Sequence, residues 1–303
     1  MKTIEELKHF YDREIAPKLL HAPKLLGGRD FIKLFIALFI VSFILMKLGY
    51  IFIAMLLFFS SFIWMWWYTE HYTPKLKKMY QDTVIIPMLH EFDPTIKYIP
   101  ERGISSAQIK ASKFFNTNFY DNVLSNSLLT YRNGTIAVTL AYFKLTKNKT
   151  KQNDDNDYFE GLFCTTDARR PINGTTIVSF DFLQKHLGFV GEGIQSNSRF
   201  GGLQKVRLDS NEFEKEYLVY STDSIEAHYI LSFTVMEKLT QIVQKYRLYP
   251  YISFVGNKIY FAMFEPSFLQ HQGGWAFEDI KQYFETIGFV VEAIEAIHHH
   301  HRV

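Results

Sequence analysis

The pattern of hydrophobic and polar positions changes sharply near residue 31. From Phe31 to Tyr68 the chain reads FIKLFIALFIVSFILMKLGYIFIAMLLFFSSFIWMWWY, whereas the segments on either side are mixed and polar. As a single α-helix this run would be about 57 Å long, roughly twice the hydrocarbon thickness of a bilayer. It is interrupted at Lys47-Leu48-Gly49, where a charge precedes a residue that tolerates positive φ. The pattern therefore predicts two helices, near 31–46 and 50–67, joined by a tight turn.

The apolarity of these helices predicts a transmembrane hairpin. Both are short for a membrane span, which implies bilayer thinning or snorkelling of lysine side chains. Two alternatives stay open: a re-entrant hairpin within one leaflet, and a pair of core helices in a soluble protein. The aromatic cluster at the end favours a full span, because amphipathic rings prefer the headgroup level. The expected membrane-anchor residues are Phe31, Lys47, Gly49, Trp64, Trp66 and Trp67.

Flanking charges predict the orientation. Lys18, Lys24 and Arg29 precede the hairpin and Lys75, Lys77 and Lys78 follow it, whereas the turn offers only Lys47. Because positive residues are retained on the cytoplasmic side, both termini are expected there. The predicted organisation is a cytosolic amphipathic helix and linker at 1–30, the hairpin at 31–68, and a cytosolic domain at 69–303.

The flanking segments begin and end with helices. Thr3 and Glu6 have the spacing of a capping box, and apolar residues recur at helical period until Pro17, so a helix is expected over about 4–16. Its apolar face has three possible partners: the rest of the protein, a partner helix or the membrane surface. A second helix is expected from Pro74 to Phe92, and the last from Trp275 to Ile297.

Between these helices the pattern predicts a mainly antiparallel sheet. Hairpin turns are expected at Asn133-Gly134 and Gly256-Asn257, and separate strands at Tyr158–Thr165 and Thr175–Phe180. Asp223 is expected to cap one long helix whose core face includes Tyr229 and Phe233. Strand hairpins alternating with helices, without a regular βαβ rhythm, indicate an α+β fold.

Composition adds few constraints. The chain of 303 residues has a formal net charge of +2, which gives no reason to expect nucleic acid as a partner. Cys164 is the only cysteine, so an intrachain disulfide is impossible, in keeping with a reducing compartment for most of the chain. The first thirty residues are charged and do not resemble a signal peptide.

No motif predicts a metal or cofactor. Asn153, Asp155 and Asp157 are followed by Tyr158 where a calcium loop needs glycine. The glycines between 188 and 202 have neither the spacing of the phosphate-binding loop that ends in Gly-Lys-Ser/Thr nor that of the dinucleotide-binding fingerprint. A mobile loop is therefore expected. His298–His301 are interpreted as an exposed terminal tract without fixed geometry. Cys164, within an apolar strand, is expected to be a packed thiol.

Several segments resemble a known family. These are FYDREIAPKL before the hairpin, IKYIPERGIS after it, YFEGLF ahead of a strand, and EFEKEYLVYSTDSIEAHYILSFTVMEKL followed by YISFVGNKIYFAMF. Together they resemble the bacterial membrane-protein family catalogued as domain of unknown function 3137. The tail from about Gly273 departs from that pattern. The resemblance implies two membrane helices and a cytosolic α+β domain at the bacterial inner membrane. It also implies a small membrane protein of the LemA type as a partner, and it supplies no activity.

Two functions are compatible with these observations. The first is a membrane-anchored interaction or scaffold module whose sheet edge or glycine-rich loop binds a protein partner. The alternative is a membrane-bound enzyme acting on a phosphate- or carboxylate-bearing substrate, because an arginine pair can clamp such groups. The candidate binding residues, all near expected loops, are Asp167, Arg169, Arg170, Glu192 and Arg199. A transport role is less favoured, since two helices without internal acids line no path.

Overall fold

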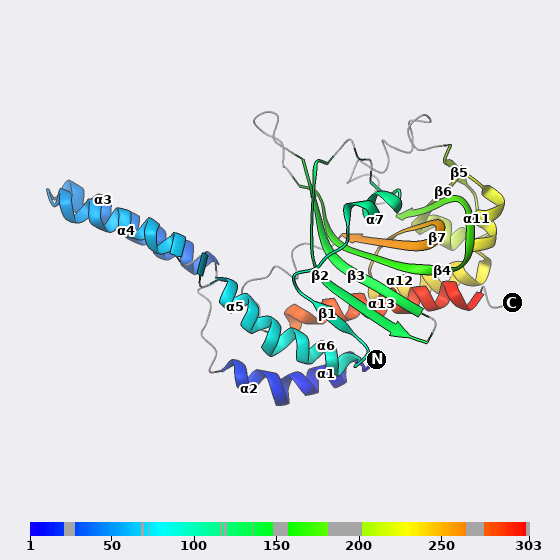
Figure 1. Cartoon of the computed structure of the whole chain (residues 1–303), viewed down its shortest axis with the longest axis horizontal. Coiled ribbons are helices and arrows are strands. Elements are labelled where there is room, and N and C mark those ends of the chain that lie inside the picture. The colour runs from blue at the N-terminus through cyan, green and yellow to red at the C-terminus, as the bar shows by residue number, and fades with distance from the viewer. Residues whose placement is uncertain are drawn as a thin grey trace. The chain divides into compact units, whose positions relative to one another are not determined.

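The computed structural model describes residues 1–20, 28–67, 70–71, 73–115, 117, 120–134, 136–147, 157–180, 202–264 and 276–300 (Figure 1). The chain forms two compact units, which we describe separately. The first comprises Met1, Asp93–Leu269 and Gln282–Val303, and the second comprises Lys2–Phe92 and Gln270–Lys281. The expected boundaries at residues 30 and 68 both fall within the second unit and stay a prediction.

The second unit is helical. Its elements are α1 (Ile4–Phe10), η1 (Tyr11–Ile15), α2 (Ala16–Leu19), α3 (Gly28–Lys47), α4 (Ile51–Trp67), α5 (Thr73–Tyr80), η3 (Gln81–Ile85) and α6 (Ile86–Phe92). The capping box is confirmed: Thr3 Oγ1 accepts a hydrogen bond from the Glu6 amide, and the Glu6 carboxylate accepts one from the Thr3 amide. This pairing satisfies two amides at the start of α1.

Two π-helical turns accommodate prolines. In η1 the Ala16 amide donates to the Tyr11 carbonyl, and in η3 the Ile86 amide donates to the Gln81 carbonyl. Pro17 and Pro87 each occupy the second position of the α-helix that follows. Proline is tolerated in a first turn, where its missing N–H has no partner to lose. The expectation that Pro17 ends the first helix was therefore wrong, because helical structure continues to Leu19.

The hairpin turn lies where the sequence predicts it. Gly49 has φ +88°, the Gly49 amide donates to the Met46 carbonyl at 3.2 Å, and the Tyr50 amide donates to Leu45 at 2.9 Å. This is a Schellman motif, which satisfies the last carbonyls of α3. Phe35 packs edge-on against Phe62, and Phe39 against Phe58, at centroid distances of 5.4 and 5.6 Å. Among the described residues, no helix has the length and apolarity that a membrane span requires.

The first unit contains an antiparallel sheet of seven described strands. They are β1 (Lys97–Ile99), β2 (Asn122–Asn133), β3 (Ile136–Thr146), β4 (Asp157–Phe180), β5 (Gln204–Val206), β6 (Tyr217–Ser221) and β7 (Tyr251–Phe264). The order is β1-β2-β3-β4-β6-β5, with β7 also paired to β4. The β2–β3 turn at Asn133-Gly134 is confirmed, and the α+β class with a mainly antiparallel sheet is confirmed as well.

Two expected breaks lie inside long strands. β4 runs without a break from Asp157 to Phe180, where two separate strands were expected, and β7 runs through Gly256-Asn257, where a hairpin turn was expected. Gly174 and Gly256 do adopt positive φ, at +69° and +62°, but they do so at register shifts between β4 and β7. A β-bulge uses the same backbone conformation as a turn, which explains the wrong predictions.

Helices complete the first unit. They are α7 (Ser106–Ala111), α10 (Asn211–Glu216), α11 (Ser224–Ile230), α12 (Phe233–Tyr246) and α13 (Phe277–His300), whose first residues belong to the second unit. The helix expected to start at Asp223 is broken at Leu231-Ser232, where Ser232 adopts extended geometry and begins α12. The expected core face of α13 is confirmed, since Ile280, Phe284, Ile287, Val291 and Ile294 are all buried.

The core of this unit is aromatic. The ring centroid of Phe115 lies 5.6 Å from that of Phe143 and 4.9 Å from that of Phe159. The ring centroids of Phe163 and Phe143 are also 5.6 Å apart. These rings, with Tyr251, Tyr260 and apolar residues of α7 and β3, form one buried cluster. Cys164 of β4 is buried, so the expected packed thiol is confirmed. Burial raises the pKa of this thiol, because it disfavours the charged thiolate.

Candidate functional site

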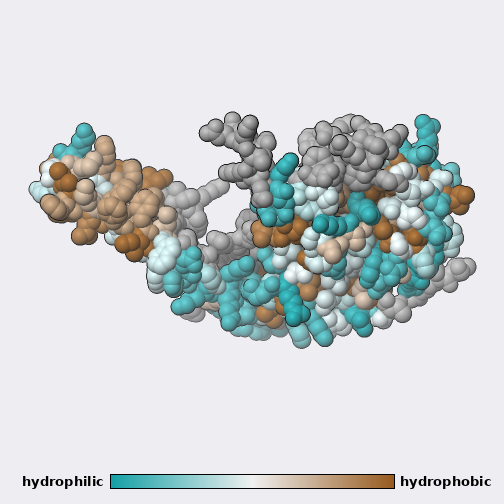
Figure 2. All heavy atoms as spheres, turned by 45° about the horizontal axis from the view of Figure 1, so that its top comes forward, coloured by the Kyte–Doolittle hydropathy of each residue, from teal (hydrophilic) through white to brown (hydrophobic). Residues whose placement is uncertain are grey.

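The exterior of the α3–α4 hairpin is almost wholly apolar. Among its exposed side chains, Phe52 is 90 % exposed, Leu56 71 % and Ile63 65 %. Among the hairpin side chains that the structure describes, the buried ones are all small, namely Ser42, Ala54 and Ser61. Figure 2 shows that hydrophobic colouring covers α3 and α4. In water such a surface is strongly unfavourable, because apolar area of this extent is normally covered.

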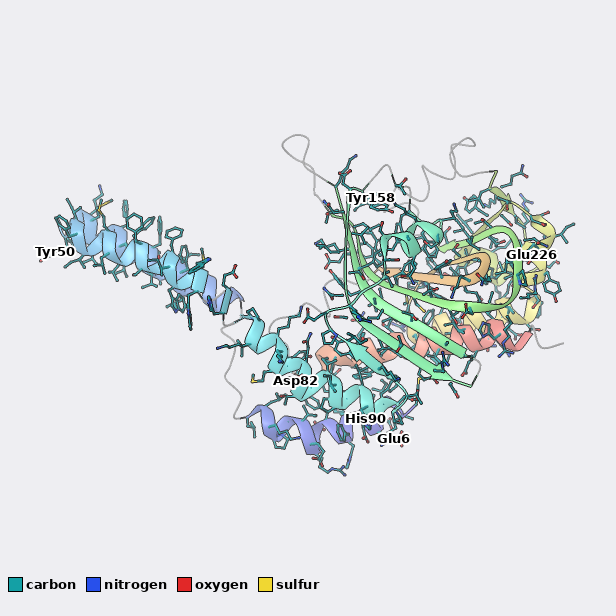
Figure 3. All side chains as sticks on the ribbon, in the orientation of Figure 1. Glu6, Tyr50, Asp82, His90, Tyr158 and Glu226 are labelled. Atoms are coloured by element: carbon teal, nitrogen blue, oxygen red, sulfur yellow. The ribbon has the colours of Figure 1, made fainter. Side chains whose placement is uncertain are left out.

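The two ends of the hairpin are chemically different. The turn carries Lys47, whose ammonium lies 5.8 Å from the Phe43 ring centroid, and Tyr50, which Figure 3 labels at the tip of the hairpin. At the other end Trp66 and Trp67 are exposed, and both rings contact the imidazole of His71 at about 6 Å. Of the expected anchor residues, Lys47, Gly49 and the three tryptophans lie at the turn and at the far end. Phe31 lies in α3, and its side chain is outside the described residues.

The candidate binding residues of the first unit divide into two groups. Asp167, Arg169 and Arg170 were expected near a loop. They lie instead within β4, at the register shift between Asp167 and Ile172. Glu192 and Arg199, together with the glycine-rich segment that contains them, lie outside the described residues. The acidic segment before Asp157 also lies outside them.

The described candidates do not converge on a common pocket. The Asp167 carboxylate accepts from Lys258 Nζ at 2.6 Å, whereas the Arg170 guanidinium pairs with the Glu226 carboxylate at 2.7 Å. Arg170 is therefore neutralised by Glu226, which Figure 3 labels on α11. An arginine already paired with a carboxylate is a poor clamp for a second anion.

Helix α11 is held against β4 by a polar network. The Asp223 carboxylate caps the helix by accepting from the Ile225 and Glu226 amides. Ser221 Oγ donates to the Asp223 carbonyl at 2.8 Å and lies 2.9 Å from Thr176 Oγ1 of β4. These bonds connect the end of β6 to β4 and to the start of α11. They fix the position of Glu226 opposite Arg170.

Exposed apolar side chains lie on α11 and at the start of α12. We define the α11 stripe as Ile225 and Tyr229 of α11 together with Phe233, the first residue of α12, which are 82 %, 53 % and 63 % exposed. The spacing of four residues places the first two on one helix face. Arg170 lies under the stripe, with its guanidinium carbon 4.3 Å from the Tyr229 ring centroid. The expected core location of Tyr229 and Phe233 was wrong; it followed from their period, which matches that of the buried Met236, Leu239 and Val243.

One histidine differs from its interpretation as part of an exposed tract. His298 is buried within α13 and makes a hydrogen bond at 3.0 Å to the Asp167 carbonyl, so it does not belong to an exposed tract. His228 is exposed and bonds the Ser224 carbonyl at 2.7 Å, as a structural helix residue does. Within the described ranges, no group of three or more His, Cys, Asp or Glu residues is arranged to hold a metal ion.

Comparisons with known proteins identify a family. The model of the family described as "Protein of unknown function (DUF3137)" matches residues 157–298, slightly under half of the chain. The match confirms the resemblance over these residues and extends it beyond Gly273, where the pattern was expected to depart. It includes β4, α11 and His298. The segments FYDREIAPKL and IKYIPERGIS lie outside it.

One solved structure has a weak likeness. It is the crystal structure of the mycobacterial trehalose monomycolate transport factor A, TtfA, with 10 % identity and a TM-score of 0.33. The alignment covers 66 % of this chain and 92 % of that one. This score is too low to indicate a common fold. No curated protein matches the chain.

Proposed function

Since residues 157–298 form a DUF3137 domain, whose family description assigns no activity, we propose that the chain is a membrane-anchored interaction module. The α3–α4 hairpin inserts into a bilayer with its Lys47–Gly49 turn leading, and the α+β unit stays at the cytoplasmic surface. There the α11 stripe binds a protein partner. The observation that carries this proposal is the exposed apolar exterior of the hairpin.

Insertion is favoured by the composition of the two helices. Lys47 is the only charged residue between Leu34 and Trp67. Leu, Ile, Phe and Val near a helix centre each favour insertion by about 0.3–0.6 kcal/mol. At 1.5 Å per residue, α3 and α4 are about 30 and 26 Å long, and α3 begins with the polar Gly28-Arg29-Asp30. The apolar part of each helix is therefore shorter than a hydrocarbon core of about 30 Å, so the proposed insertion requires local thinning of the bilayer or snorkelling of lysine side chains. The Ser42 and Ser61 hydroxyls donate to carbonyls of their own helices, which removes a cost of burial in lipid.

Insertion is tested with membranes from cells that produce the full-length chain. These membranes are extracted with alkaline carbonate, which releases peripheral proteins. We expect the chain to stay in the membrane pellet, whereas release into the supernatant would contradict insertion. The orientation has a separate test. A reporter that is active only in the cytoplasm is fused to either terminus. We expect both fusions to be active, because the lysines that flank the hairpin outnumber the single lysine of the turn.

Partner binding is assigned to the α11 stripe because it is apolar, exposed and rigidly held. Aromatic residues beside an arginine are typical of residues that dominate protein interfaces. The partner class is a protein, and a small membrane protein of the LemA type is the specific candidate that the family resemblance supplies.

The partner test compares two sets of substitutions in the full-length chain, extracted in mild detergent. Ile225→Ser, Tyr229→Ser and Phe233→Ser together are expected to abolish co-purification of the LemA-type protein. Ile99→Ser with Leu124→Ser removes exposed apolar side chains of β1 and β2 and is expected to leave it unchanged. Equal recovery with both variants would contradict the assignment of the stripe.

The enzyme alternative stays a prediction. It needs an unpaired cationic site, and Arg170 is engaged by Glu226. Binding of a phosphate or carboxylate would then depend on Arg169 of β4 or on Arg199, which lies outside the described residues.

A further inference from the structure

A cluster of positive charge follows the hairpin. We define the α5 lysines as Lys75, Lys77 and Lys78, which are all exposed, whereas Leu76 between them is buried. None of the three makes an ion pair with a described residue. The sequence contains no Asp or Glu between Glu70 and Asp82, so no acid of α5 itself neutralises them. One short helix therefore presents three ammonium groups to its surroundings.

This cluster lies close along the chain to the aromatic end of the hairpin. Lys75 follows Trp67 by eight residues, a span of at most about 29 Å even when fully extended. Trp66 and Trp67 are exposed and contact His71, which comes between them and the lysines. Tryptophan side chains in membrane proteins lie at the headgroup level. Flexible lysine side chains that start nearby can reach the same level.

We propose that the α5 lysines bind the phosphate groups of anionic phospholipids and give the hairpin a preference for such lipids. The inference rests on the proposed insertion of the hairpin. Lysine is a compact charge on a flexible stem, suited to mobile headgroups and not to a ligand of fixed geometry. The net charge of the whole chain is only +2, so the attraction is local and does not extend to anions in general.

The tryptophans themselves report which lipid lies beside them. Three of the four, Trp64, Trp66 and Trp67, lie at the end of α4. A Trp275→Phe variant removes the fourth signal. The full-length variant is reconstituted in vesicles of equal parts phosphatidylcholine and phosphatidylglycerol, with brominated acyl chains on one lipid class at a time. Bromine quenches tryptophan fluorescence at short range, so the two quenching curves compare the two lipids at the same site.

Brominated phosphatidylglycerol is expected to quench about two- to fivefold more effectively than brominated phosphatidylcholine, because each lysine near an anionic surface strengthens association. High salt should remove the difference, since about 1 M salt screens charge within roughly 3 Å. Lys75→Gln, Lys77→Gln and Lys78→Gln together should remove it at low salt. Lys205→Gln, Lys215→Gln and Lys238→Gln remove the same charge from exposed positions of the other unit and should preserve it.

Equal quenching by the two lipids, or an excess that survives the α5 substitutions, would overturn the lipid preference while leaving insertion intact. Absence of quenching by both lipids would instead contradict insertion and, with it, the inference. An excess that the control substitutions also remove would mean that overall charge, and not α5, attracts the lipid.

Discussion

The Arg170 guanidinium lies between a carboxylate and an aromatic ring, 2.7 Å from the Glu226 carboxylate and 4.3 Å from the Tyr229 ring centroid. Arg170 belongs to β4, and both of its partners belong to α11. This relationship connects the sheet to the exposed stripe. It also explains why Tyr229 stays exposed on a face whose period predicts burial, since the ring covers the arginine.

We expect Arg170→Met to lower the free energy of unfolding by about 2–3 kcal/mol, because it leaves the Glu226 carboxylate, 10 % exposed, without its cation. Adding Glu226→Gln should recover most of the loss. The measurement is chemical denaturation of the full-length chain in detergent. Arg132→Met, at an exposed position of β2, is the control and should change little. A loss below about 0.5 kcal/mol for Arg170→Met would contradict a structural role for the pair.

Gly161→Ala should be severely destabilising. A Cβ at Gly161 would lie 2.0 Å from the Met263 carbonyl oxygen, so β4 and β7 would have to separate. We expect a loss of about 3 kcal/mol or more in the free energy of unfolding.

Gly288→Ala is the matched control for this change. The three atoms nearest to its Cβ would all belong to the Tyr246 side chain, with the hydroxyl at 3.1 Å and the ring carbons at 3.7 and 3.8 Å, and the end of that side chain can shift. Alanine favours a helix over glycine by about 1 kcal/mol, which offsets the shift. The substitution should therefore be within about 0.5 kcal/mol of neutral, and thermal melting of both variants checks the contrast. Equal melting temperatures would show that β4 and β7 approach less closely than described.

The fold should lose stability in alkaline solution. Burial raises the pKa values of Tyr217, Tyr251 and Tyr283 well above their ordinary value of about 10. A raised pKa means that the folded state favours the protonated phenol. The stabilisation is thus complete below about pH 10 and is lost as the pH rises above it. Melting temperatures between pH 8 and 11, with tyrosinate absorbance, measure this loss.

Tyr217 offers a specific check of that prediction. Its hydroxyl is buried and has no hydrogen-bond partner among the described residues. Tyr217→Phe should therefore cost little at neutral pH and should move the alkaline loss of stability upward. A large loss at neutral pH would show that the hydroxyl has a partner, and an unchanged alkaline transition would show that Tyr217 does not contribute to it.

Local signals in the sequence predicted much of the fold. The Lys47–Gly49 break, the Thr3–Glu6 capping box and the Asn133-Gly134 hairpin depend on neighbouring residues alone, and all three are confirmed. Asn173-Gly174 and Gly256-Asn257 carry the same local signal. Their positive φ belongs to bulges that form only when β4 pairs with β7, a contact between distant segments that no local pattern contains.

The candidate site was predicted only in part. Arg170 was selected for its charge, but its partners Glu226 and Tyr229 come from a helix about sixty residues later in the chain. The exposure of Phe233 follows from the break at Leu231-Ser232, which the uniform apolar period did not indicate. Ser232 in the position before a helix is the one signal from which this break could have been inferred.

The central claim is that the α3–α4 hairpin lies in the hydrocarbon of a bilayer, and one labelling measurement tests it directly. Cys164 is fully buried, so a Phe52→Cys variant can be labelled at that position alone with an environment-sensitive fluorophore. Leu124→Cys, at an exposed position of β2, is the control. In vesicles, lipids brominated on their acyl chains should quench the label at Phe52→Cys, and aqueous iodide should not. The control should show the reverse. Quenching of Phe52→Cys by iodide, without quenching by brominated lipid, would contradict the account.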